Sequence, residues 1–136
     1  EVEKLFNERF KNKHTIHTDT TTAELIKYMN NTFFATKVSI MNEFKRLAEV
    51  LNADWEDALY GFASDGRVGD SHLHVPGPDG KRGYGGTCFP KDVNALITLA
   101  EELKVPLHTI KGGWATNLEV RSEKDWEGNK GRAVSY

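Results

Sequence analysis

The sequence predicts an all-α domain built on one long central helix. Between Ala23 and Leu51 the chain has neither proline nor glycine, and apolar residues recur at intervals of three, four and seven positions, the spacing of one helix face. Two shorter segments, beginning near Pro90 and Pro106, also show helical spacing. At 136 residues the chain is long enough for one domain with a modest core.

The first twenty residues predict two small elements. Apolar residues at helical spacing predict an amphipathic helix over residues 2–11, and Thr15–Thr18 predict a short strand. Both are too small to be stable alone, and the chain begins at Glu1 without a methionine. We therefore expect a fragment of a longer protein, with residues 1–20 the end of a larger N-terminal domain.

The long helix is predicted to begin at a threonine run in which Thr21 and Glu24 form a capping box. A helix of about 28 residues would be about 42 Å long, which exceeds the width of a compact domain of this size. We therefore expect its apolar stripe to pack against a second copy of the chain, as a homodimer, or against another domain. The stripe comprises Ile26, Met29, Phe33, Ile40, Phe44, Leu47 and Leu51.

After the long helix, Asp54 is predicted to cap a short helix that ends at Gly61. Residues 62–87 contain nine glycines and prolines and predict a long irregular loop, a feature that is often functional. A further helix begins after Val105-Pro106. Its inward positions are predicted to be Leu107, Ile110, Trp114 and Leu118. The charged residues 119–136 predict a linker into a missing domain, with a possible strand at Arg132-Ala133-Val134.

The block Gly83–Asp92, GYGGTCFPKD, contains the only cysteine, Cys88. Glycines before it and Pro90 after it place the thiol where a loop enters a helix, since proline suits a first helical turn. Free N–H groups and the helix dipole there favour a thiolate, the nucleophilic form. A lone cysteine is also commonly a small buried apolar residue, and the spacing leaves both interpretations open. Asp92 lies one turn further on.

Other polar residues carry possible chemistry. Lys27 and Asn31 share a face of the long helix, and an ammonium beside a reacting carbonyl can stabilise an oxyanion; an ordinary solvated pair is the alternative. Arg67, in the glycine-rich loop, is a candidate anion clamp or simply an exposed side chain. Three more polar residues of the long helix are interpreted as surface or interface positions: Lys37, Asn42 and Glu43.

Composition excludes several classes of function. A net charge of −2 and a pI near 6.2 give no support for a nucleic-acid surface. No apolar run approaches the roughly 18 residues of a membrane span, and no signal peptide is visible. One cysteine excludes an internal disulfide and fits a reducing cytoplasm. The five histidines lack metal-site spacing, and GYGGT is not a dinucleotide-binding fingerprint. We therefore expect no metal and no nicotinamide-binding fold in these residues.

Three segments together resemble the UDP-glucose/GDP-mannose dehydrogenase family: the long helix beginning TTAELIKYMNN, the loop start DGRVG, and the block GYGGTCFPKDVNAL. The resemblance covers roughly residues 15–118. It implies that residues 21–118 form the helical dimerisation domain that carries the catalytic cysteine. Residues 1–20 would end the N-terminal dinucleotide-binding domain, and residues 119–136 would lead into a C-terminal nucleotide-binding domain, both of them α/β.

The resemblance also implies an activity: a two-step, NAD-dependent oxidation of a sugar nucleotide's C6 alcohol, UDP-glucose becoming UDP-glucuronate. A cysteine thiohemiacetal and then a thioester would be the intermediates. Cys88 would be the nucleophile and Lys27 would stabilise the oxyanions. Asn31 would place the lysine, substrate and water, while Asp92 would orient or activate the water and hold Lys27.

Binding residues follow from the same resemblance. Arg67 would reach the sugar nucleotide across the dimer interface. Gly83, Tyr84 and Gly85 would line the sugar pocket. Cys88, Phe89, Pro90 and Lys91 would border the nicotinamide.

Three alternatives stay open. Because nothing in the chain holds NAD, we expect no dehydrogenase activity from these residues alone, and a non-catalytic dimerisation module is one possibility. The loop His72–Lys81, HLHVPGPDGK, is unusually rich in proline and glycine, so the substrate could instead be GDP-mannose or a UDP-N-acetylamino sugar. A thiol hydrolase is the weakest alternative, because no histidine stands at a recognisable partner position.

Overall fold

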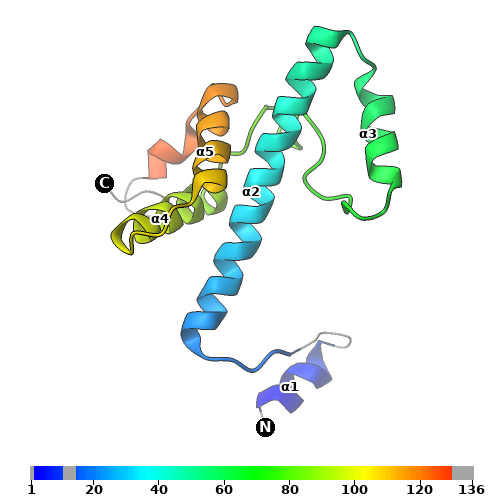
Figure 1. Ribbon diagram of the computed structural model, residues 1–136. Helices are drawn as coiled ribbons and strands as arrows, with labels where there is room; N and C mark the ends of the chain where they lie inside the picture. The colour runs from blue at the N-terminus through cyan, green and yellow to red at the C-terminus, as the bar shows by residue number, and fades with distance from the viewer. Residues whose placement is uncertain (1, 11–14, 130–136) are drawn as a thin grey trace.

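The computed structural model describes residues 2–10 and 15–129, and within these ranges it is helical without any strand (Figure 1). The elements are α1 (Val2–Arg9), α2 (Thr20–Leu51), α3 (Trp55–Ser64), α4 (Cys88–Glu102), α5 (His108–Val120) and a 3-10 helix at Asp125–Asn129. Figure 1 shows α2 as the axis of the molecule, with α3 on one side and α4 and α5 on the other. The predicted all-α class is confirmed for the described residues.

The N-terminal predictions are confirmed in part. The helix predicted over residues 2–11 is present as α1. The strand predicted at Thr15–Thr18 is wrong, because these exposed residues have no regular structure. A strand needs a neighbour for its backbone N–H and C=O groups, and the described residues provide none. The strand predicted at Arg132-Ala133-Val134 lies outside the described residues.

Helix α2 begins at a carboxylate that the sequence analysis passed over. Asp19 Oδ1 accepts a hydrogen bond from the Thr22 backbone N–H at 3.0 Å, and its Oδ2 accepts from Thr22 Oγ1 at 2.6 Å. The predicted Thr21–Glu24 capping box is therefore wrong, because a carboxylate at the positive end of the helix is the stronger cap. These hydrogen bonds also lower the pKa of Asp19.

The two faces of α2 differ in a way that matters for assembly. Apart from Met41, the buried face is made of small or polar residues: Thr32, Ala35, Ser39, Asn42 and Ala48. Small side chains let α5 approach closely, and Ser39 Oγ donates to the Gly113 carbonyl at 2.6 Å. Every residue of the predicted apolar stripe is exposed, from Ile26 at 37% to Phe33 at 66%. The folded chain therefore leaves the stripe uncovered, and its homodimeric partner stays a prediction.

Helix α3 is capped as predicted but ends later. Asp54 Oδ1 accepts from the Asp57 N–H at 3.0 Å. The predicted end at Gly61 is wrong, because the helix continues to Ser64; glycine weakens a helix interior by about 1 kcal/mol without breaking it. Trp55 and Leu59 anchor α3 in a core that also contains Met41, Ala48, Leu73 and Val75.

Residues 65–87 form the expected irregular loop, and α4 begins at Cys88 as predicted. One inward position of α5 is wrong: Leu118 is 39% exposed, while its neighbour Asn117 is fully buried. Helix α5 turns Asn117 inward because the side chain meets the main chain of the loop there.

The segment after α5 packs back onto the domain. Trp126 is buried against Trp114, with ring centroids 5.4 Å apart, and Trp114 packs on a second core of Ala35, Tyr84 and Val93. The wider interpretation of residues 119–136 as a linker stays a prediction. Among the described helices, none combines the length and apolarity needed to cross a membrane.

Candidate active site

Helices α2 and α4 bring three polar side chains together around Asp92, whose side chain is 1% exposed. Asn31 Nδ2 donates to Asp92 Oδ2, and Lys91 Nζ donates to Oδ1 at 2.6 Å. Lys27 Nζ lies 3.8 Å from the same Oδ1 and is itself 58% exposed. The structure thus unites Lys27, Asn31 and Asp92, and it places Asn31 against the carboxylate.

The charges of this cluster favour an anion. Burial by itself raises the pKa of Asp92, but hydrogen bonds from Lys91 and Asn31 and the charges of Lys91 and Lys27 outweigh it and hold the pKa below its usual value. The hydrogen bond with Asp92 raises the pKa of Lys91. At neutral pH two ammonium groups therefore surround one carboxylate. The excess positive charge is suited to stabilising a negative oxygen.

The thiol lies on the same helix as Asp92. Cys88 is exposed and is the first residue of α4. The preceding Thr87 makes no side-chain capping hydrogen bond, so no side-chain oxygen at the N-cap takes up the first N–H groups of the helix. Residues four apart share a helix face, so Cys88 lies one turn from Asp92. Phe89 is half-buried and Pro90 is buried beside them.

The glycine loop before Cys88 lines a groove with a volume of about 660 Å³. The groove is bounded by Val38, His72, His74, Pro76, Gly77, Pro78, Asp79, Gly83, Tyr84, Gly85, Gly86, Phe89 and Asp125. Gly83 has φ +68, and a Cβ there would collide with Asn117. The three residues predicted to line a sugar pocket are thus on a groove wall. Burial raises the pKa of Tyr84, which keeps its hydroxyl neutral.

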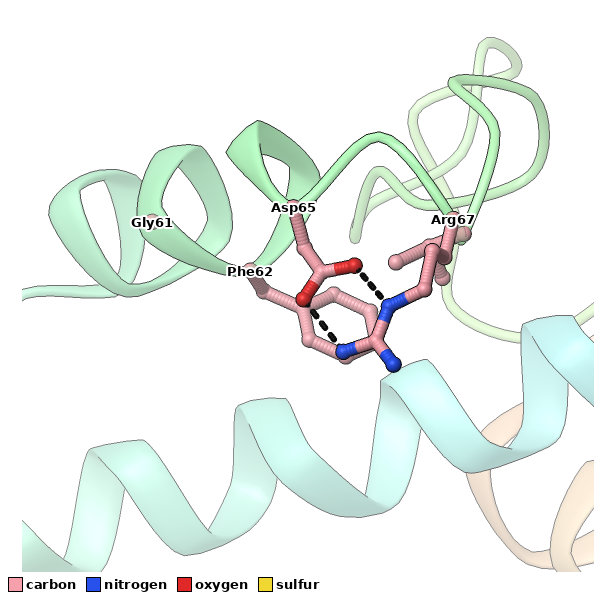
Figure 2. Close-up of a pocket in the computed structure, with 5 residues that line it drawn as sticks. Gly61, Phe62, Asp65 and Arg67 are labelled. Atoms are coloured by element: carbon pink, nitrogen blue, oxygen red, sulfur yellow. Dashed lines mark hydrogen bonds and ion pairs between the residues drawn. The ribbon is translucent and has the colours of Figure 1, made fainter.

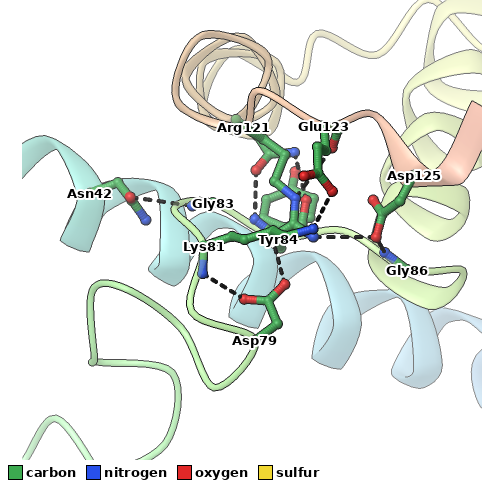
Figure 3. A network of polar contacts seen from close by, with 10 residues as sticks. Asn42, Asp79, Lys81, Gly83, Tyr84, Gly86, Arg121, Glu123 and Asp125 are labelled. Atoms are coloured by element: carbon green, nitrogen blue, oxygen red, sulfur yellow. Dashed lines mark hydrogen bonds and ion pairs between the residues drawn. The ribbon is translucent and has the colours of Figure 1, made fainter.

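Two buried asparagines hold this loop. Asn42 Oδ1 accepts from the Gly83 N–H at 3.2 Å (Figure 3). Asn117 accepts from the Tyr84 N–H at 2.7 Å and donates to the Tyr84 carbonyl at 3.0 Å. The interpretation of Asn42 as a surface or interface residue is therefore wrong. Its side chain is buried because the loop backbone needs a partner inside the protein.

Lys37 holds the first part of the loop, also through hydrogen bonds to its backbone. Its ammonium donates to the carbonyl oxygens of Val68 (3.0 Å), Gly69 (3.0 Å) and Ser71 (2.6 Å). His72 follows with φ +62 and stacks on Phe34, ring centroids 4.5 Å apart. Burial, with the charge of Lys37, lowers the pKa of His72. Lys37 is therefore a loop-holding residue, while Glu43 is an exposed acceptor for Thr116 Oγ1 at 2.5 Å.

Arg67 stands apart from the Asp92 cluster. Its side chain is 86% exposed and donates through Nε and Nη2 to Asp65 (Figure 2). Gly61, Phe62 and Val68 line the same shallow pocket. Within one chain Arg67 therefore contacts an acid of its own loop, and among the described residues it forms no hydrogen bond or ion pair with Lys27 or Asp92.

Sequence reasoning missed several contributors. Lys91 was expected only beside the nicotinamide, yet it is the nearer of the two lysines to Asp92. Asn117, Arg121 and Asp125 were not singled out. The signal for Asn117 was a polar residue on the inward face of α5, three positions after Trp114. Across the described residues, no group of three or more His, Cys, Asp or Glu could hold a metal ion.

Comparison with known proteins places this arrangement in a family. Residues 21–119 match the model of the UDP-glucose/GDP-mannose dehydrogenase family, central domain. The chain therefore belongs to the UDP-glucose/GDP-mannose dehydrogenase family.

Individual relatives agree. The chain is 42% identical over 94 residues to "UDP-glucose 6-dehydrogenase YwqF" of Bacillus subtilis. The aligned residues make up 69% of this chain and 20% of that protein. It is 40% identical over 102 residues to UDP-glucose 6-dehydrogenase of Rhizobium meliloti. That alignment covers 75% of this chain and 22% of the relative. For the Pseudomonas aeruginosa protein of the same name the identity is 49% over 80 residues, covering 59% and 17%. The chain thus spans about a fifth of the length of these relatives.

Proposed function

We propose that this chain is the central domain of an NAD-dependent sugar-nucleotide dehydrogenase that oxidises the C6 alcohol of UDP-glucose to the carboxylate of UDP-glucuronate. The observation that carries the proposal is the cluster of Lys27, Lys91 and Asn31 around Asp92, one helical turn after Cys88 at the start of α4. The names of the relatives support the substrate.

The residues have distinct roles in this scheme. The first oxidation removes a hydride and a proton from the alcohol and gives an aldehyde. The Cys88 sulfur then forms a bond to the aldehyde carbon, and the carbonyl electron pair moves to oxygen, where Lys27 stabilises the charge. The second oxidation gives a thioester. Water adds to its carbon, the C–S bond breaks, and the carboxylate and free thiol result.

Asp92 orients this water and holds the lysines in place. A general base works best with a pKa near the operating pH, whereas the surroundings of Asp92 keep its pKa below the usual value. A firmly ionised carboxylate is an acceptor for a water proton and a partner for two ammonium groups. Asn31 keeps the carboxylate in one orientation through Oδ2.

NAD, when bound, supplies the acceptor for the hydride in each oxidation. The described residues contain no strand, so the βαβ unit that binds dinucleotides is not among them. In this part of the chain, Cys88, Phe89, Pro90 and Lys91 would border the nicotinamide. We therefore expect no dehydrogenase activity from these 136 residues alone.

The exposed stripe on α2 is the proposed homodimer interface. Arg67 would then contact the sugar nucleotide bound to the partner subunit, consistent with its exposure and with its pairing to Asp65 of its own loop. A reducing, cytoplasmic compartment suits a free reactive thiol.

The test is a substrate assay of the full-length protein that contains this chain. With UDP-glucose and NAD, the proposal predicts two NADH formed per UDP-glucose consumed. Equal or faster turnover of GDP-mannose or a UDP-N-acetylamino sugar would favour a sister dehydrogenase. No turnover of any of them, with an intact dimer, would favour a non-catalytic dimerisation module.

A further inference from the structure

Arg121, which directly follows α5, is almost fully buried, although no proposed catalytic step uses it. Its side chain is 2% exposed. Nη1 donates to Asp79 Oδ2 at 2.7 Å, Nη2 to Asp125 Oδ2 at 3.2 Å, and Nε to the Glu123 carbonyl at 3.3 Å (Figure 3). A buried guanidinium requires partners of this kind. They come from two segments that lie 46 residues apart (125 − 79).

The first of these segments is the proline- and glycine-rich loop. Asp79 Oδ1 accepts from the Lys81 N–H at 3.1 Å, and the Gly77 N–H donates to the Lys81 carbonyl at 2.9 Å. These two hydrogen bonds close the turn within residues 77–81, and Arg121 adds a contact from outside the turn. Burial by itself raises the pKa of Asp79, but the hydrogen bond from Arg121, with that from the Lys81 N–H and the charge of Arg121, holds it below its usual value. Asp79 lines the groove.

The second segment supports the glycine loop. Asp125 Oδ2 accepts from the Gly86 N–H at 3.1 Å, as Figure 3 shows. Gly86 has φ +72 and lies two residues before Cys88. A Cβ on Gly85 would collide with both Asp125 and the Arg121 guanidinium. A side chain at position 85 would thus displace the ion pair, because the ion pair lies directly against the main chain there.

We propose that Arg121 and Asp125 are positioning residues: they join the two walls of the groove and fix the backbone that places the Cys88 thiol. Asp125 holds the Gly86 amide, and Arg121 ties Asp125 to the turn at Asp79. The ion pair therefore determines how the proline- and glycine-rich loop stands relative to the reactive residue. The proposal rests on the proposed function in taking Cys88 as the reacting thiol.

The test compares Asp125→Ala, Asp125→Asn and Glu127→Ala in the full-length protein. Glu127 is the matched control, because it is an exposed carboxylate in the same 3-10 helix. Two properties are measured by mass spectrometry on the peptide that contains Gly86 and Cys88: amide hydrogen exchange, and the rate of alkylation of Cys88 by iodoacetamide. Thermal unfolding first selects variants that fold.

Asp125→Ala should speed exchange at Gly86 about tenfold, the effect of losing one hydrogen bond to a charged group, and should change the alkylation rate about threefold or more. Asp125→Asn keeps an oxygen that can accept the Gly86 N–H, so its effects should be smaller. Glu127→Ala should match the parent within about twofold. A folded Asp125→Ala that matches Glu127→Ala in both measurements would overturn the proposal.

A second variant covers the case in which Asp125→Ala does not fold. Asp79 is 47% exposed, so Asp79→Asn loosens the ion pair from its solvent side. It should change the alkylation rate of Cys88 in the same direction as Asp125→Asn, and no change would count against the proposal. Neither measurement needs NAD or sugar nucleotide. The experiment can therefore refute the positioning role of Arg121 and Asp125 without refuting the proposed oxidation, and the substrate assay can refute the oxidation without refuting the positioning role.

Discussion

Asp92 is the residue whose environment most constrains the proposed chemistry. It is buried, and it accepts from Lys91 and Asn31 with Lys27 close by. A group whose pKa is lower in the folded than in the unfolded chain stabilises the fold above its unfolded pKa, and this stability is lost as the pH falls through the folded pKa. Asp92 therefore contributes stability at neutral pH that acid removes.

Asp92→Asn should lower the free energy of unfolding by about 2–4 kcal/mol at pH 7, because it leaves Lys91 and Lys27 facing an uncharged amide. The difference between parent and variant should shrink as the pH falls below about 4, where Asp92 of the unfolded parent takes up a proton, until the folded parent is protonated at a lower pH. Urea unfolding at a series of pH values measures this. All other titratable groups are present in both proteins, so their effects cancel in the difference between the two free energies of unfolding. A difference that stays constant between pH 7 and pH 3 would refute a stabilising role for the ionised Asp92.

Individual residues differ in how far the sequence predicts their roles. The position of Cys88 at a helix start was predictable, because glycine and proline have strong local preferences. The structural roles of Asn42 and Asn117 were not predictable, because their hydrogen-bond partners are backbone groups 41 and 33 positions away. Asn42 lies among apolar residues and looks like an interface residue until the loop is placed on it.

At the scale of the element, α2 was the most predictable part of the molecule. Its end at Leu51 followed from the absence of proline and glycine. The helix is longer than the roughly 28 residues that were predicted, because Asp19, which precedes the apolar pattern, caps it. At 32 residues and 1.5 Å per residue the helix is about 48 Å long. Its two faces are divided between α5 and α4 on one side and the exposed stripe on the other.

Leu47→Glu on the stripe should convert a dimer to a monomer, or weaken it at least about a hundredfold, because burying a charge in an apolar interface is strongly unfavourable. Leu99→Glu on α4 is the control: Leu99 is 46% and Leu47 52% exposed, so the two substitutions differ mainly in their helix. Sedimentation velocity measures both. Equal sedimentation of the two variants would contradict an interface on α2.

At the scale of the whole molecule, the proposal makes each active site depend on two chains. Arg67→Ala and Cys88→Ala should each abolish activity as homodimers. In an equal mixture that has exchanged subunits, half of the dimers should be mixed, and each mixed dimer should contain one complete site. Recovery of about a quarter of parental activity would follow. No recovery after proven exchange would show that Arg67 acts in its own chain or not at all.

Local sequence preferences predicted the helices, whereas the arrangement of the loop depended on long-range contacts. Lys37 holds three carbonyls of residues more than 30 positions away, and Arg121 joins Asp79 to Asp125. No periodicity marks such contacts. The grouping of Lys27, Asn31 and Asp92 came from the family resemblance, since helix spacing alone cannot say which faces meet.

The central claim is that Cys88 forms a covalent bond with the substrate carbon. The most direct measurement is mass spectrometry of the Cys88 peptide from full-length protein quenched in acid during turnover of UDP-glucose with NAD. We expect an adduct with the mass of a thioester of UDP-glucuronate on Cys88, and neither adduct nor UDP-glucuronate from Cys88→Ala. Parental rates of UDP-glucuronate formation by Cys88→Ala would contradict it.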